Sequence, residues 1–253
     1  MKKNMEKLIE ELKNLTSLGV VGIKQSFEDE GALSQDILTM KRITEQVGLD
    51  LSVKIGGCEA KTDIQFCKSI NANKIVAPMV ETPFALTKFI ESIITIPKLN
   101  FYINIESKTA YENLDDILSS PSSKLLSGIV IGRSDLTKSY GFGKDYVDSH
   151  QMQDIVYKAL VKCKEYNMTT LMGGNISSKS SEFIKRLYIE ELLEYIETRN
   201  VIIKLNNENI NNIGLIIKSS LIFESEWLQY KANQYNNIGK EYLNRSNIIM
   251  NRI

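Results

Sequence analysis

The stretch Gly128-Ile129-Val130-Ile131-Gly132-Arg133-Ser134-Asp135-Leu136 shows the pattern on which the fold of this chain depends. A short apolar run rich in Val and Ile passes into a polar turn that contains glycine. The run lacks the alternation of polar and apolar residues that marks a strand with one face in water. It therefore predicts a strand buried on both faces, with polar groups at its carboxyl end.

The same pattern recurs along the chain and alternates with amphipathic stretches. Predicted strands cover residues 19–24, 51–55, 74–78, 100–105, 128–132, 169–172 and 196–205. Predicted helices cover residues 34–47, 60–70, 83–93, 110–118, 152–166 and 182–193. Strand–helix repetition of this length is typical of an α/β barrel or of an open doubly wound sheet.

Two observations favour the α/β fold with a (β/α)8 TIM barrel. Nearly every predicted strand ends in a polar or glycine-containing segment, and in a barrel such ends converge on one face and form one site. No Gly-x-Gly-x-x-Gly motif follows the first strand, which argues against a dinucleotide-binding sheet. Only seven strands are evident, so we expect the eighth to be hidden, absent or supplied differently, and the first strand to be atypical.

The end of the chain differs from the rest. Residues 1–205 are predicted to form the barrel domain, and residues 206–253 a C-terminal helical extension of one or two long helices. Two interpretations stay open for this extension. It either closes the barrel or packs on a partner subunit, where Trp227 would suit an interface core and the protein would be a homo-oligomer.

Composition excludes several classes of protein. The chain has 253 residues with 31 basic and 31 acidic side chains, which argues against a nucleic-acid-coating protein. No apolar run reaches the roughly 18–20 residues that cross a bilayer, and the basic start leads into an amphipathic helix at 8–13 instead of a signal-peptide core. The cysteines, three in number, are too scattered for a disulfide scaffold and predict reduced thiols in a cytoplasmic protein.

Two carboxylates give the strongest chemical signal. Glu106 follows the predicted strand 100–105, and Asp135 follows the next one, 128–132. Two desolvated carboxylates side by side repel each other unless something neutralises them. A hard divalent cation with few protein ligands would do so, and Mg²⁺ or Mn²⁺ is favoured because no His or Cys nearby suits Zn²⁺. The alternative is that both are ordinary capping or salt-bridged residues.

Glycine-containing turns supply candidate substrate-binding groups. Gly132, Arg133 and Ser134 present backbone N–H groups just after a strand, and such a turn can hold a carboxylate or enolate oxygen. Gly173 and Gly174 offer a similar loop, where a ligand can approach the backbone closely.

Two cations are candidates for neutralising an anionic substrate. Lys54 lies within an apolar strand, and an ammonium facing the lumen is tolerated beside carboxylates or an anion. The alternative places it on the outer face, with its stem between helices. Arg199 could hold a carboxylate through two parallel hydrogen bonds, or bond its own loop.

These segments resemble the HpcH/HpaI aldolase and citrate lyase family. The similarity runs from Gly19 to Ser178, and Pro78-Met79-Val80-Glu81 and Gly132-Arg133-Ser134-Asp135-Leu136 are its more specific parts. Family members are TIM barrels of the phosphoenolpyruvate/pyruvate-binding superfamily. They break or form a carbon–carbon bond beside a pyruvate-like or acyl-CoA enolate, with Mg²⁺ or a similar metal. The resemblance implies that Glu106 and Asp135 are metal ligands and that the backbone at 132–135 holds the substrate carboxylate.

The chain also departs from the family pattern. The aldolase branch usually has Arg where Lys54 stands, so the charge is kept but the planar two-pronged grip is lost. The Glu-His-Gly base motif of that branch is replaced by Glu28-Asp29-Glu30-Gly31, with Glu30 at the position of the His. Glu28 or Glu30 is therefore the candidate acid/base, provided that burial raises its pKa toward neutrality.

The resulting hypothesis is a divalent-metal-dependent carbon–carbon lyase or aldolase. It would act on a small 2-oxo acid through a pyruvate-type enolate, with Lys54 and Arg199 neutralising the anion. Two alternatives stay open. One is a CoA-ester lyase of the citrate lyase type, and the other is a non-catalytic barrel that binds a carboxylate or scaffolds a partner.

Overall fold

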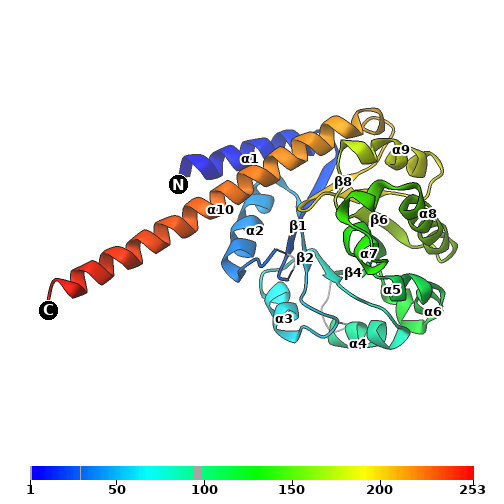
Figure 1. Cartoon of the computed structure of the whole chain (residues 1–253), viewed down its shortest axis with the longest axis horizontal. Coiled ribbons are helices and arrows are strands. Elements are labelled where there is room, and N and C mark those ends of the chain that lie inside the picture. The colour runs from blue at the N-terminus through cyan, green and yellow to red at the C-terminus, as the bar shows by residue number, and fades with distance from the viewer. Residues whose placement is uncertain (1, 29, 94–98) are drawn as a thin grey trace.

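The computed structural model describes residues 2–28, 30–93 and 99–253, and over these residues it forms a closed barrel of eight strands in chain order (Figure 1). The strands are β1 (Val20–Ser26), β2 (Asp50–Lys54), β3 (Lys74–Ala77), β4 (Asn100–Ile105), β5 (Gly128–Gly132), β6 (Thr169–Gly173), β7 (Tyr195–Glu197) and β8 (Val201–Lys204). The predicted TIM-barrel architecture is confirmed.

Helices alternate with the strands and cover the outside of the barrel (Figure 1). They are α2 (Ser34–Val47), α3 (Lys61–Ser69), α4 (Pro83–Ile93), α5 (Lys108–Glu112), α6 (Leu114–Ser119), α7 (Arg133–Ser139), α8 (His150–Glu165) and α9 (Ser181–Ile189). Short 3₁₀ turns are η1 (Pro121–Leu125), η2 (Lys144–Asp148), η3 (Ser178–Ser180) and η4 (Ile210–Asn212). Helix α1 (Lys2–Thr16) precedes β1, and α10 (Ile213–Met250) follows β8.

The prediction of one strand over residues 196–205 is wrong, because this run forms a hairpin. Strands β7 and β8 pair antiparallel, with Ile196 opposite Ile203, and β8 also pairs antiparallel with β1. The eighth strand is therefore the second half of the run. The turn Thr198-Arg199-Asn200 was hidden in the sequence because it has neither Gly nor Pro. The atypical strand is the last one, although the pairing of β1 shifts between Val20 and Gly22.

The lumen of the barrel has an apolar layer and, closer to the carboxyl ends of the parallel strands, a polar layer, which we call the upper lumen. Val76, Tyr102, Val130, Leu171 and Ile202, each from a different strand, form a buried cluster separate from the main core under the helices. Side chains alternate along a strand, so residues two positions further point the same way. Two positions after Tyr102, Val130 and Leu171, toward the carboxyl ends of the strands, the chain has Asn104, Gly132 and Gly173. The sequence thus leaves room and polarity at the carboxyl ends of the strands.

Helix α10 first packs on the barrel and then leaves it. Near its middle it lies beside α1, and Lys7 Nζ lies 2.6 Å from Glu226 Oε1 (Figure 1). Tyr235 donates a hydrogen bond to Asp36 in the first turn of α2, and every residue from 236 to 253 is exposed. The last part of the helix therefore projects from the barrel. Within the ranges described above, no helix is long and apolar enough to cross a bilayer.

Candidate active site

A buried ion pair lies in the upper lumen. Lys54, at the end of β2, places Nζ 3.0 Å from Oε2 of Glu106, which directly follows β4. The two residues are 4% and 2% exposed. Asn104 Nδ2 donates to the same oxygen at 2.8 Å, and the backbone N–H of Met79 donates to Oε1 at 3.2 Å. Lys54 thus lies inside the barrel, and three donors converge on Glu106, which suits a charged carboxylate.

Strand β5 passes directly against Glu106. A Cβ added at Gly132 would lie 2.8 Å from Glu106 Cβ and 3.0 Å from Oε2, so only glycine fits there without displacement. Asp135 follows in the first turn of α7 and is half-buried. In the part of the chain that the structure describes, its carboxylate has no hydrogen-bond or ion-pair partner. One carboxylate therefore lies deep in the lumen and the other at its rim.

The candidate metal ligands in this region are oxygen atoms, which fits a hard divalent cation. Besides Glu106 and Asp135, Asn104 Oδ1 is buried and accepts no hydrogen bond from any described residue. Mg²⁺ is commonly held by one or two carboxylates while keeping several waters. Among the described residues, no group of three His, Cys, Asp or Glu side chains is arranged to hold a metal ion. Because Lys54 shares Glu106, a bound cation would compete with its ammonium for that carboxylate.

The side chain of Arg133 is engaged in protein contacts. It is 0% exposed, with Nη1 at 2.8 Å from Asp148 Oδ1 and Nη2 at 3.1 Å from both Gly174 O and Ser180 Oγ. It therefore ties α7 to η2 and to the loop after β6. These partners enclose the guanidinium, so position 133 can offer a ligand only its backbone N–H.

The two glycines at the end of β6, Gly173 and Gly174, lie against different neighbours. Gly174 has a φ of +83°, and a Cβ there would lie 2.4 Å from Ser134 N and 2.6 Å from Arg133 N. Glycine at 174 thus allows this conformation and leaves the two amides uncovered. A Cβ at Gly173 would instead lie 2.7 Å from Glu197 Oε1, so Gly173 makes room for a second lumenal carboxylate.

That second carboxylate belongs to another ion pair, which the sequence analysis did not assign. Lys24 Nζ of β1 lies 2.5 Å from Glu197 Oε1 of β7, and the side chains are 12% and 4% exposed. The arrangement parallels Lys54 and Glu106, because each glutamate lies at a strand end beside a glycine of the neighbouring strand. The alternation of side chains along a strand could have indicated this residue. Glu197 lies two positions after Tyr195, which packs on the lumenal cluster, so both side chains point into the lumen.

Glu30 lies at the mouth beside the β7–β8 hairpin. Asn200 Nδ2 lies 2.8 Å from its Oε1 and 2.9 Å from its Oε2. Burial raises the pKa of Glu30 from its ordinary value, although the Asn200 hydrogen bond and the charges of Lys24, Arg199 and Lys231 oppose that shift. The exposed Arg199 is thus brought to the same part of the mouth as Glu30.

The other candidate acid/base has a different environment. Glu28 is exposed and lies beside Gly56, where an added Cβ would be 2.8 Å from Glu28 Oε1. Asp29, between the two glutamates in the quoted motif, lies outside the described residues. Of the two candidates, Glu30 is the one with the buried surroundings that acid/base chemistry near neutral pH requires.

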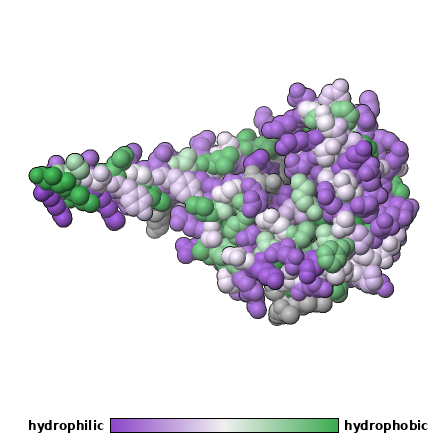
Figure 2. Space-filling view, turned by 60° about the horizontal axis from the view of Figure 1, so that its bottom comes forward, coloured by the Kyte–Doolittle hydropathy of each residue, from purple (hydrophilic) through white to green (hydrophobic). Residues whose placement is uncertain are grey.

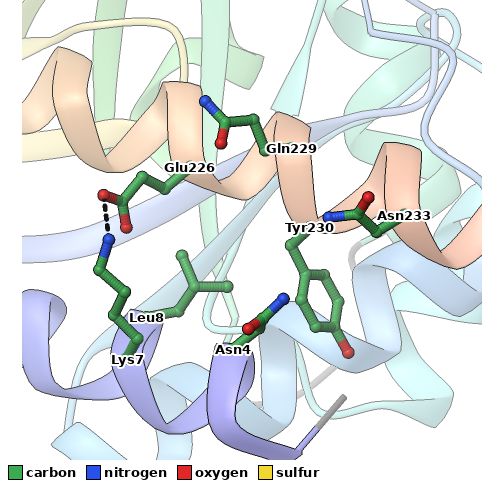
Figure 3. Close-up of a pocket in the computed structure, with 7 residues that line it drawn as sticks. All are labelled: Asn4, Lys7, Leu8, Glu226, Gln229, Tyr230 and Asn233. Atoms are coloured by element: carbon green, nitrogen blue, oxygen red, sulfur yellow. Dashed lines mark hydrogen bonds and ion pairs between the residues drawn. The ribbon is translucent and has the colours of Figure 1, made fainter.

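Two surface cavities lie outside this region. One, of about 160 Å³, lies between α1 and α10 and is bordered by Lys7, Glu226 and Tyr230 (Figure 3). The other, of about 510 Å³, lies where α9 and α10 begin, and Ser181 and Lys218 are among its lining residues. Neither includes a residue of the lumenal ion pairs.

The family model described as HpcH/HpaI aldolase/citrate lyase matches residues 35–177. The fold is similar to the crystal structure of citrate synthase SbnG, with a TM-score of 0.59, 14% identity, and coverage of 80% of this chain and 83% of that one. It is also similar to an HpcH/HpaI aldolase/citrate lyase family protein from Burkholderia cenocepacia J2315, with a TM-score of 0.59, 13% identity, and coverage of 86% and 84%. RipC from Yersinia pestis gives a TM-score of 0.52 at 13% identity, with coverage of 77% and 87%. No curated protein matches the chain in sequence. At these identities the structural likeness concerns the fold alone.

Proposed function

Because the chain belongs to the HpcH/HpaI aldolase/citrate lyase family, we propose that it is a carbon–carbon lyase or aldolase whose site is the upper lumen of the barrel. We propose further that the substrate is a small 2-oxo acid and that the reaction needs Mg²⁺ or Mn²⁺. The observation that carries this proposal is the pairing of Lys54 with Glu106 in the lumen, together with the carboxylate of Asp135 after the adjoining β5, which pairs with no described residue.

Glu106 and Asp135 would hold the cation, and Asn104 Oδ1 offers a further oxygen in the same layer. When bound, a divalent cation supplies Lewis-acid stabilisation of the enolate that forms as the carbon–carbon bond breaks. With the cation on Glu106, the ammonium of Lys54 can turn toward an anionic substrate in the lumen. Arg199 is exposed on the hairpin and can bind a carboxylate at the open side of the mouth.

Glu30 is the proposed acid/base. In the bond-breaking direction its carboxylate takes the proton of the substrate hydroxyl while the carbon–carbon bond breaks, and the bonding electrons go to the enolate. The same proton then returns to the enolate carbon, so no further reactant is required. A carboxyl group whose pKa is raised by burial is suited to both transfers.

The test is release of pyruvate from 4-hydroxy-2-oxo acids, measured with EDTA and after addition of Mn²⁺. We expect activity to disappear in EDTA and to return with Mn²⁺, and Asp135→Asn to lower kcat/KM by about 10²-fold or more. The matched control is Asp154→Asn, because Asp154 is a surface residue with a 59% exposed side chain. Activity that survives both EDTA and Asp135→Asn would refute the proposal. Cleavage confined to CoA esters would instead favour the citrate lyase alternative, and no Mn²⁺ binding at all would favour a non-catalytic barrel.

We also propose that the projecting end of α10 packs on a second copy of the chain. Its exposed apolar residues include Tyr242, Leu243, Ile249 and Met250, and the tip of the projection in Figure 2 shows hydrophobic side chains next to hydrophilic ones. A helix without tertiary contacts is only marginally stable in water. The segment also carries Lys240, Arg245 and Arg252 against a single acidic residue, Glu241.

The mouth of a second barrel complements this basic, apolar segment. Met79 and Phe84 there are 50% and 72% exposed, and the exposed Glu28 and Glu59 add negative charge. We expect the full chain to be an oligomer by light scattering, and Leu243→Glu combined with Met250→Glu to yield folded monomers. A monomeric unaltered chain would contradict this.

The compartment proposed is the cytoplasm, in keeping with Cys58, Cys67 and Cys163, which are all free thiols.

A further inference from the structure

Glu224 of α10 is a buried carboxylate that fixes the β7–β8 hairpin. It is 5% exposed, and its Oε1 accepts hydrogen bonds from Thr198 Oγ1 at 2.5 Å, Asn200 N at 2.6 Å and Val201 N at 3.2 Å. Buried backbone N–H groups require such acceptors. This turn therefore has its conformation set by a side chain from a distant helix.

Asn200 connects this turn to Glu30, because its backbone N–H donates to Glu224 while its side-chain amide donates to Glu30. Its Nδ2 lies 2.8 Å and 2.9 Å from the two oxygens of Glu30 and 3.0 Å from Lys24 O. The backbone carbonyl of Asn200 accepts a hydrogen bond from the backbone N–H of Lys24 at 2.6 Å. An amide has two N–H donors, so one can serve the carboxylate while the other serves the backbone of β1. Asn200 is 1% exposed and cannot turn away without leaving buried groups unpaired.

Two of the three cations near Glu30 are paired with other carboxylates. Lys24 of β1 is paired with Glu197, and Lys231 of α10 lies 3.2 Å from Asp36 Oδ2. Arg199 on the hairpin is exposed. A cation in direct contact would hold Glu30 ionised, whereas a neutral amide orients the carboxyl group and still lets it take up a proton. Glu30 itself belongs to the loop between β1 and α2, which gives it no regular backbone support.

We infer that Asn200, held in place by Glu224, is the positioning residue for Glu30, so that α10 reaches the acid/base group through the hairpin. This inference rests on the proposed function, in which Glu30 transfers the proton.

The test follows the Glu30 carboxyl group directly. Its titration is measured by ¹³C NMR on protein labelled at glutamate, with the signal assigned by its absence in Glu30→Gln. Four further proteins are compared with the unaltered chain: Asn200→Ala, Glu224→Ala, Glu224→Gln and Asn209→Ala. Asn209 is the matched control, because it is a buried asparagine whose amide donates to Lys204 O and Leu18 O at the opposite end of β8.

In Asn200→Ala we expect the pKa of Glu30 to lie above that of the unaltered chain, because burial persists while the donor that favours the carboxylate is lost. We expect kcat to fall about tenfold with KM changed less than about twofold, since orientation of the proton-transfer group is what is lost. Glu224→Ala should act in the same direction. Glu224→Gln keeps an acceptor oxygen and should restore most of the titration and activity, and Asn209→Ala should leave both unchanged.

An unaltered Glu30 titration in Asn200→Ala would overturn the positioning role, whatever the activity. An equal shift in Asn209→Ala would also overturn it, because the effect would then be general loosening of the barrel. If Asn200→Ala does not fold, Asn200→Ser and the Glu224 pair decide the question in the same way. Full activity in Glu30→Gln would instead overturn the acid/base role in the proposed function. The positioning role of Asn200 would still stand if Asn200→Ala shifts the titration of Glu30.

Discussion

Lys54 Nζ lies 3.0 Å from Glu106 Oε2, and the two side chains are enclosed in the lumen of the barrel with 5% and 2% exposure. Removing two charges from water is costly, and their attraction offsets this only when further hydrogen bonds satisfy the pair. Asn104 and the backbone of Met79 supply those bonds to Glu106. The pair is therefore well satisfied where it lies, and removing either partner would leave the other charge buried without it.

Breaking this pair should be strongly destabilising. In Lys54→Met, the donors that remain to Glu106 among the described residues are the neutral Asn104 amide and Met79 N–H, and we expect the free energy of unfolding to fall by about 3–5 kcal/mol. Urea denaturation measures this. The control is Lys158→Met, since the ion pair of Lys158 with Asp154 has side-chain exposures of 62% and 59%. Its loss should cost less than about 1 kcal/mol. Equal losses in the two variants would show that the lumenal pair is not specially coupled to folding.

The close approach of β5 to Glu106 predicts that Gly132→Ala is damaging. Its Cβ would lie 2.8 Å from Glu106 Cβ, so a side chain or the strand must shift. Such overpacking typically costs about 1–3 kcal/mol. We also expect weaker Mn²⁺ binding by calorimetry, because Glu106 is displaced. Gly57→Ala is the control, as nothing lies within 4 Å of its added Cβ. Normal Mn²⁺ affinity in Gly132→Ala would separate Glu106 from the metal.

Arg133→Met distinguishes a structural side chain from a substrate-binding one. The variant leaves Asp148 without its buried partner and removes the donors to Gly174 O and Ser180. We expect a loss of about 3–5 kcal/mol in unfolding free energy, with KM of the folded fraction changed less than about twofold. A large rise in KM with unchanged stability would place the guanidinium in substrate binding.

Glu30 should give the protein a recognisable pH dependence. Burial raises the pKa of this carboxyl group above its ordinary value of 4.5, so the folded chain binds its proton more tightly than the unfolded chain does. The resulting stabilisation is fully present below the unfolded pKa and is lost as pH rises through the folded pKa. The unaltered chain should therefore lose stability relative to Glu30→Gln as the pH rises above the ordinary pKa of 4.5. Urea unfolding of both proteins across this range measures the difference, and a constant or opposite difference would contradict it.

The sequence predicted most of the barrel because local signals agreed with the final packing. The bounds of α2, α4, β4 and β5 coincide with the predicted ranges, since apolar runs there are bounded by clear polar residues or Pro. Helix α7 was not predicted, because its 7 residues are too few to show a helical period. The β7–β8 hairpin was missed because its turn is held by Glu224 from α10, a contact that no local pattern contains.

The site was predictable where side-chain direction follows from a strand. Lys54 was singled out inside an apolar strand and Glu106 just after one, and the structure places both side chains in the lumen. Arg133 was harder to interpret, because it begins a helix and its direction depends on Asp148 and Ser180 in later segments. Glu197 was overlooked within a run interpreted as one strand. Pairings between distant segments, such as Lys24 with Glu197, need the three-dimensional structure.

The antiparallel closure by β8 has a consequence for how the chain is made. During synthesis β1 emerges early, yet its second neighbour comes from residues 201–204, near the far end of the chain. Until then the growing sheet has an unpaired edge along β1, and unpaired edges are templates for pairing with other chains. The nascent protein is thus most exposed to aggregation just before the ribosome releases its last strand, and that interval is when a chaperone would matter most.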